Sequence, residues 1–405
     1  MSIAFVLFSI TCFVLGLSFP KQKQVKLFMF LVITLPFLNI NTKIHVNYQI
    51  PFYLFFLLGG VIKNIYPNRR LSTTDLILIL LLFFFFCYMV VSIPLFYHHD
   101  FINIIKDVKF IYFSLILYAL VLINGPLQTA QLSDFDIFLK WNFIIAVTCF
   151  SLMYFFNIHL TLNQDSYFKI NEVRYMNYGT YVLPIYTIYA LANNIVIRKS
   201  NWLYIIVPLL ISGNRTLMLL LFLVSITIIL KRLSERKLLI LLASFLSAVF
   251  FVIFVVSKAS LQSPLFRIKK LLSIDYLASS INTRLSPFYI ALESFDSYDY
   301  IFGKGLGFTY YIPWFHYRAN LNNYNIYLDS LIPTLYGKYG VFLILPLLVF
   351  VLYLKKFSDS KSYYYYLLFF VLLGLTNSFL YQNYLTFILF VMFYLKSCSL
   401  TKRNC

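Results

Sequence analysis

Apolar segments follow one another along almost the whole chain, and this constrains the fold more than any single motif. Of the 405 residues, 61% are hydrophobic and only 12% are charged. A helix needs about 20 consecutive apolar residues to cross a bilayer, and a water-soluble protein needs more polar surface than this chain offers. The runs are continuous rather than alternating, which favours helices over the strands of a membrane barrel. We therefore predict an all-α, polytopic membrane protein with about 11–13 transmembrane helices.

The candidate spans are residues 3–19, 27–40, 51–62, 76–97, 110–125, 141–157, 179–197, 202–211, 216–230, 238–257, 340–354, 363–380 and 384–395. One long polar stretch interrupts them and contains the motifs NTRLSPFYIALESF, FGKGLGF and YNIYLDSLIPTLYGKYG. The sequence thus divides into transmembrane helices with short loops (1–257), a large and partly helical polar loop (258–340), and C-terminal transmembrane helices with a tail (341–405). We expect the polar loop to carry the function.

The formal net charge of +19 comes from lysine and arginine clusters that lie in alternate loops. These clusters include Lys21 and Lys23, Arg69 and Arg70, Arg198 and Lys199, Lys231 and Arg232, and Lys355 and Lys356. Loops rich in Lys and Arg stay in the cytoplasm, so the positive-inside rule explains the basic excess without a nucleic-acid partner. The same rule places the N-terminus and the polar loop outside and the C-terminus inside.

Cysteines and histidines give no metal or disulfide framework. The five cysteines are scattered and lie mostly in spans or in the C-terminal tail. His98, His99 and Asp100 form the one local cluster of ligating residue types, and the alternative interpretation is a solvated loop edge. We therefore predict no metal site.

Three arginines lie in loops that the charge pattern places outside: Arg174, Arg215 and Arg284. Arg215 stands between two apolar runs, after a Ser-Gly-Asn turn and before Thr216, a candidate helix N-cap. An arginine near membrane depth costs ~2.5–3.5 kcal/mol on insertion scales, so it normally faces a polar cavity or a partner. Each could instead be a solvated loop charge or snorkel to the headgroups. Together, the guanidinium groups suit a diphosphate ligand, whose oxygens they bind as a fork.

The FGKGLGF motif places Gly303, Gly305 and Gly307 around Lys304. It lacks the spacing and context of a nucleotide-binding loop. Two interpretations remain open: a simple glycine turn, or a close backbone approach to a ligand with Lys304 adding charge.

The order of these features resembles the bacterial O-antigen polymerases (Wzy-type) and the related O-antigen ligases. The shared elements are an SGNRT-type turn, an arginine that begins a helix, a G-x-G-x-G turn, and an N-x-Y-L-D segment before a Gly-x-x-Gly pair. The resemblance implies a GT-C-type glycosyltransferase of the bacterial inner membrane with its active site facing the periplasm. Its substrates would be undecaprenyl-diphosphate-linked oligosaccharides, joined by inversion without metal, cofactor or nucleotide sugar, alongside a chain-length regulator protein.

The resemblance also implies roles for individual residues. Arg215 and Arg284 would act on the donor diphosphate, and Asp329 and His316 are the nearby catalytic candidates, although Asp329 could instead cap or pair within the loop. The substrate-binding candidates are Arg174, Gly303, Lys304, Gly305, Gly307, Tyr324 and Asn325. Ligases usually have a histidine where this chain has Tyr324, and a phenol with a reference pKa near ~10 is a poor base at neutral pH.

Polymerase is therefore the function that the sequence favours. An O-antigen ligase that transfers polysaccharide to lipid A core is one alternative, and a lipid-linked oligosaccharide flippase is another. A flippase should have short outer loops and charges among its spans, whereas this chain has a long polar loop.

Overall fold

The computed structural model describes residues 3–18, 26, 49–63, 76–77, 79–83, 99–101, 103–104, 106–107, 117, 127, 130–156, 175, 177–231, 274–313, 323–382 and 384–403. The predicted spans at 27–40 and 238–257 lie outside these residues, as do most of 76–97 and 110–125.

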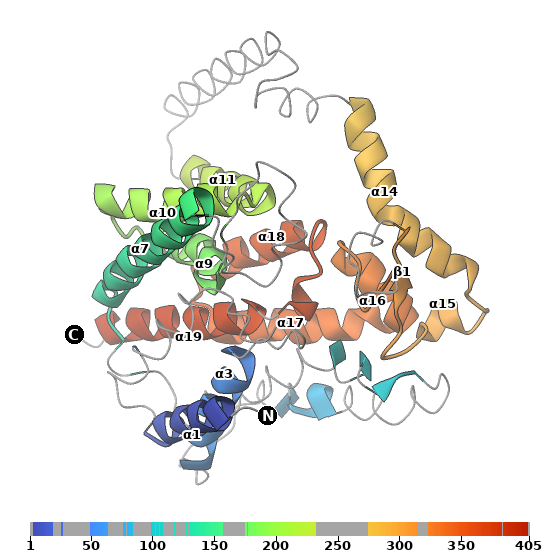
Figure 1. Ribbon diagram of the computed structural model, residues 1–405, viewed down its shortest axis with the longest axis horizontal. Helices are drawn as coiled ribbons and strands as arrows, with labels where there is room; N and C mark the ends of the chain where they lie inside the picture. The colour runs from blue at the N-terminus through green and yellow to red at the C-terminus, as the bar shows by residue number, and fades with distance from the viewer. Residues whose placement is uncertain are drawn as a thin grey trace.

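The described chain is mostly helical, as the sequence predicts (Figure 1). Its α-helices are α1 (Ile3–Leu17), α3 (Gln49–Lys63), α7 (Ser133–Phe156), α9 (Tyr178–Ala192), α10 (Lys199–Ser212), α11 (Arg215–Leu230), α14 (Ile274–Glu293), α15 (Asp299–Phe302), α16 (Leu331–Tyr339), α17 (Ile344–Phe357), α18 (Tyr363–Gly374) and α19 (Tyr384–Arg403). Two short 3-10 helices, η3 (Gly340–Leu343) and η4 (Phe379–Tyr381), and two short strands, β1 (Tyr310–Tyr311) and β2 (Tyr324–Asn325), complete the described elements.

Most predicted spans within the described residues coincide with a helix, but five boundaries differ by five residues or more. The helix α7 begins eight residues before the span predicted at 141–157, and α19 continues eight residues past the span predicted at 384–395. The span predicted at 179–197 ends at Ala192, because Asn193 caps α9 through its backbone N–H and Asn194 takes a positive φ of 57°. The span predicted at 363–380 ends at Gly374, after which the chain turns into η4. The span predicted to begin at residue 340 begins nine residues earlier, with α16.

Two helical segments of the described chain are long and apolar enough to cross a membrane. They are α7 and the continuous run of α16, η3 and α17, at Leu331–Phe357. The second segment begins inside the polar stretch and includes Lys338. An apolar helix therefore starts within the segment that its composition marks as polar.

The main core is built around α9, which is buried on nearly all sides. It packs against α7, α10, α11, α18 and α19, and lies among them in Figure 1. Aromatic stacking joins α9 to α19, with ring centroids 3.8 Å apart between Tyr181 and Tyr384 and 4.4 Å between Tyr178 and Phe387. A helix that is apolar all round is one that other helices must enclose.

The described part of the polar stretch forms a separate group of elements on the right of Figure 1. α14 packs on α16 and on β1, while β1 pairs with β2 in antiparallel register, Tyr310 opposite Asn325. Ala291, Tyr310, Ile312 and Leu328 form a small core of their own between these elements. This part of the stretch is thus a folded unit that is continuous with the apolar helix through α16.

Candidate functional site

A fully buried ion pair joins α16 to a distant part of the chain. Lys338 Nζ contacts Asp107 Oδ2, and both side chains are 0% exposed. The backbone N–H of Gly307 donates to the same carboxylate oxygen at 2.6 Å. Burial raises the pKa of Asp107, whereas the Lys338 ammonium and the Gly307 N–H oppose that rise by stabilising the carboxylate.

The FGKGLGF turn wraps around the end of α16. Gly303, Gly305 and Gly307 have φ values of 73°, 83° and 84°, a region that glycine adopts without steric cost. The backbone N–H of Lys304 donates to the Gly337 carbonyl at 2.9 Å, and that of Gly305 donates to the Lys338 carbonyl at 3.0 Å. These bonds satisfy carbonyls that the end of a helix leaves without an intrahelical partner. The turn therefore caps the C-terminal end of α16.

Close backbone packing explains why the turn needs glycine. A Cβ added to Gly303 would lie 2.2 Å from the Lys338 carbonyl carbon, and one added to Gly340 would lie 2.4 Å from the Ile301 carbonyl oxygen. The G-K-G-x-G turn and the Y-G-K-Y-G segment of the sequence are thus the two halves of one contact. We name this contact, together with Asp107, the α16 clasp.

Lys304 is occupied within the same region. Its Nζ forms an ion pair with Asp299 Oδ2 at 2.5 Å, and its carbonyl contacts a ring nitrogen of His99 at 2.6 Å. The four residues predicted from the motif to bind substrate, Gly303, Lys304, Gly305 and Gly307, all lie in the α16 clasp. Of the two interpretations that the sequence leaves open, these contacts favour the structural turn.

Arg215 is the first residue of α11, directly after a tight turn. Gly213 takes a φ of 60° at the end of α10, and the side chain of Asn214 accepts a hydrogen bond from the Leu217 N–H at 3.1 Å. The N-cap of α11 is therefore Asn214, and the prediction of Thr216 is wrong. The Asn214 side chain precedes the helix and accepts from a free N–H group of its first turn. Thr216 lies within that turn and does not cap it.

A backbone hydrogen bond connects the chain after Arg174 to the last turn of α10. The Tyr175 N–H donates to the Ile211 carbonyl at 3.3 Å, close to the end of α10. Tyr175 directly follows Arg174 in the sequence, and Ile211 precedes Arg215 by four residues. Arg174 itself lies outside the described residues, as do His98 and His316.

Arg284 belongs to a different part of the molecule. It is exposed on α14, which packs on α16 and β1, whereas α11 packs on α9 and α18. Figure 1 shows α11 and α14 well apart. The helices that carry Arg215 and Arg284 thus lie apart, although the resemblance assigns both residues to one diphosphate.

The N-x-Y-L-D segment presents a mixed surface beside α14. Tyr324 is exposed and its ring meets that of Tyr311 edge to face at 5.5 Å. The Asn325 side chain donates to the Tyr327 carbonyl at 2.9 Å and accepts from the Ile326 N–H at 3.1 Å, so it shapes the turn. Asp329 is exposed and makes no ion pair or hydrogen bond within the described part of the chain, which leaves its carboxylate open to solvent.

The buried pair is the feature that sequence reasoning missed. A signal was present: Lys338 is a charge inside an apolar helix of membrane-spanning length, and such a charge normally has a partner. No pattern in the sequence identifies Asp107 as that partner, because the two residues lie 231 positions apart. Within the described ranges, no three metal-ligating side chains come together.

We predict that Lys338→Met lowers the free energy of unfolding by about 3–5 kcal/mol, because the Asp107 carboxylate stays buried without its counter-ion. The double variant Lys338→Met/Asp107→Leu should recover much of that loss. Arg198→Met is the control, since Arg198 forms an exposed pair with Asp136 at 3.9 Å and should cost about 0–1 kcal/mol. Unfolding of the purified protein in detergent measures all three. A double variant as unstable as the single one would contradict this account of the pair.

Comparison with known proteins places the chain in a family without assigning an activity. No curated protein and no solved structure matches the sequence. One family model matches residues 134–404, which covers α7 through α19 and includes both halves of the glycine contact in the α16 clasp. The chain belongs to this family, DUF6369, which is described as a family of unknown function.

Proposed function

We propose that this protein is a multi-pass glycosyltransferase of the bacterial inner membrane that polymerises undecaprenyl-diphosphate-linked oligosaccharide repeat units on the periplasmic face. One contact supports this function most directly: the hydrogen bond from the Tyr175 N–H to the Ile211 carbonyl. It ties the chain that follows Arg174 to the turn that leads into Arg215. The resemblance assigns both arginines to the substrate, and guanidinium groups suit a diphosphate.

The membrane setting is supported by composition and by helix length. The chain is 61% hydrophobic, and two of its described helical segments are long and apolar enough to cross a bilayer. The full set of about 11–13 spans, in a GT-C-type arrangement, extends this observation to the whole chain. Alternate basic loops then place the turn at Arg215 and the polar stretch on the outer side.

The chemistry needs few protein groups. A hydroxyl oxygen of the acceptor repeat unit bonds to the anomeric carbon of the growing chain, the bond from that carbon to the diphosphate oxygen breaks, and the hydroxyl proton passes to a carboxylate or to water. Arginines stabilise the charge that develops on the departing diphosphate, and positioning supplies much of the remaining rate enhancement. Asp329 is an exposed carboxylate that can take the proton.

The α16 clasp contributes rigidity to this arrangement. It fixes the polar stretch against an apolar helix through a buried ion pair and backbone hydrogen bonds. Arg284 lies on α14, which packs on α16, and Asp329 lies in the segment that leads into α16. Arg284 is separate from α11, and we therefore assign it to the incoming saccharide chain or to a second phosphate rather than to the same oxygen atoms as Arg215.

The topology is tested by single cysteines placed next to Arg174, next to Arg215 and at Ser280. These positions should react with a membrane-impermeant maleimide in intact spheroplasts, because the charge pattern places them outside. Cysteines at Arg232 and Lys356 are the matched controls and should react only after the membrane is permeabilised. The opposite pattern would invert the protein and remove the periplasmic site.

The function is tested by arginine variants in cells that make the polymer. Arg215→Ala and Arg284→Ala should abolish it, whereas Arg→Lys at either position should retain part, because charge survives and the bidentate fork does not. The matched control is Arg198→Ala, an exposed arginine on the cytoplasmic side. Cells with the inactive variants should carry a single repeat unit on lipid A core. Cells that carry no repeat unit at all would point to a ligase or a flippase.

A further inference from the structure

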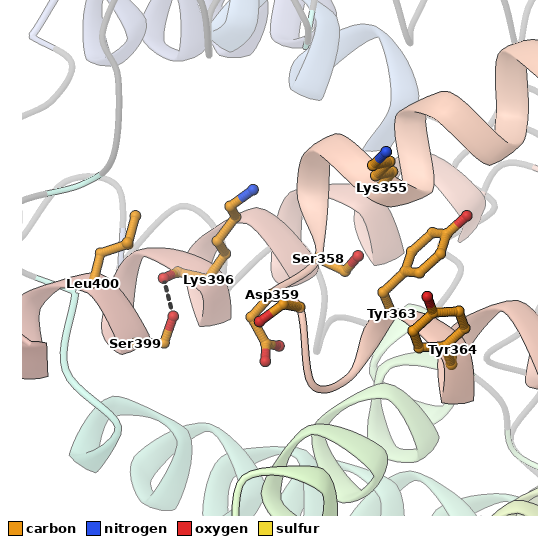
Figure 2. Close-up of a pocket in the computed structure, with 9 residues that line it drawn as sticks. Lys355, Ser358, Asp359, Tyr363, Tyr364, Lys396, Ser399 and Leu400 are labelled. Carbon is orange, nitrogen blue, oxygen red and sulfur yellow. Dashed lines mark hydrogen bonds between the residues drawn. The ribbon is translucent and has the colours of Figure 1, made fainter. Parts of the chain in front are cut away.

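A separate cavity of about 460 Å³ lies where α17 ends, α18 begins and α19 passes beside them (Figure 2). Seven of its nine lining residues carry an ammonium group or a hydroxyl. The lining residues used below are Lys355, Ser358, Tyr363, Tyr364, Lys396 and Ser399. By the charge pattern this end of the helices faces the cytoplasm, opposite to the proposed site.

The two ammonium groups keep free donor capacity. Lys396 Nζ donates to the Lys356 carbonyl at 2.6 Å, which uses one of its three N–H groups. Lys355 is exposed and forms no ion pair within the described part of the chain. Both charges are therefore available to an anion in the cavity.

The one carboxylate in the lining is turned away and held by other groups. Asp359 Oδ2 accepts from the Asn193 side chain at 3.3 Å, from the Lys361 N–H at 3.2 Å and from the Ser362 N–H at 3.3 Å. Figure 2 shows its carboxylate on the opposite side of the view from the Lys396 ammonium and the Tyr363 hydroxyl. The described lining thus carries two ammonium groups and one carboxylate, and that carboxylate is held by donors from Asn193, Lys361 and Ser362.

The position of Lys355 favours a lipid headgroup, rather than a soluble ion, as the anion that this cavity would bind. Lys355 lies in the last turn of the apolar run Leu331–Phe357, which is long enough to cross a membrane. The end of such a run lies at headgroup depth, and the tyrosines that begin α18 are typical of that depth. Basic pockets between helices on this side of a membrane bind phosphate-bearing headgroups.

We infer that this cavity binds the headgroup phosphate of an anionic phospholipid of the cytoplasmic leaflet, with Lys355 and Lys396 as counter-ions and the hydroxyl of Tyr363 as a further donor. The site would anchor the cytoplasmic ends of α17, α18 and α19. This inference requires the apolar helices to lie in a membrane, but it does not depend on polymerase chemistry.

The test measures binding of dioctanoyl phosphatidylglycerol to the purified full chain in detergent by native mass spectrometry. Lys355→Gln should weaken binding about fivefold, since one basic residue near the surface contributes ~1 kcal/mol. Tyr363→Phe should weaken it as well without a change in charge. Lys361→Gln is the matched control, because Lys361 lies in the loop that follows α17, carries the same charge as Lys355 and does not line the cavity.

Three results would overturn the inference. Equal losses in Lys355→Gln and Lys361→Gln would show general surface attraction rather than a site. Displacement of the lipid by an equal concentration of inorganic phosphate would make a soluble phosphate the ligand. Equal binding of dioctanoyl phosphatidylcholine would remove the preference for an anionic lipid.

Discussion

The buried ion pair between Lys338 and Asp107 is the contact that holds the polar stretch against the rest of the described chain. Two opposite charges are buried completely, and each stays there only because the other is present. Lys338 belongs to the helix that continues as α17, and Asp107 also holds the Gly307 N–H of the glycine turn. One carboxylate thus connects three distant parts of the chain.

This dependence explains the unusual sequence of the polar stretch. The glycines of the turn have positive φ and pack against the backbone of α16, so larger residues would collide with it. The glycine turn, which in sequence resembles a ligand-binding loop, caps the C-terminal end of α16 in the structure. Arg284 on α14, Tyr324 and Asp329 are exposed in the same stretch.

Much of the helical structure could be predicted from the sequence, because long apolar runs have few alternatives to a helix in a membrane. Helix ends were harder. Asn193 and Asn214 stop or start helices through local hydrogen bonds that an apolar pattern does not reveal. The helix α16 was missed because Lys338 and Gly337 make the segment look polar, while the partner that buries Lys338 comes from another segment.

The candidate site, too, could be predicted from the sequence only in part. A backbone hydrogen bond from Tyr175 to Ile211 joins the chain after Arg174 to the end of α10, while the grouping of the arginines on one side of a membrane stays a prediction. The distance between α11 and α14 could not be foreseen, since spacing along a chain does not set how helices pack. The glycine motif was ambiguous in sequence, because a turn that approaches a ligand and a turn that covers a helix end require the same residue.

The central claim is the proposal that this protein joins lipid-linked repeat units mainly by positioning and arginine electrostatics, without a metal or a nucleotide sugar. Purified protein in liposomes, supplied with undecaprenyl-diphosphate-linked repeat units and a chelator but no nucleotide sugar, tests it most directly. The account predicts products of two or more repeat units by mass spectrometry, with release of undecaprenyl diphosphate, and none from the Arg215→Ala protein. A strict requirement for a divalent metal or a nucleotide sugar, or transfer only to an added lipid A core acceptor, would contradict it.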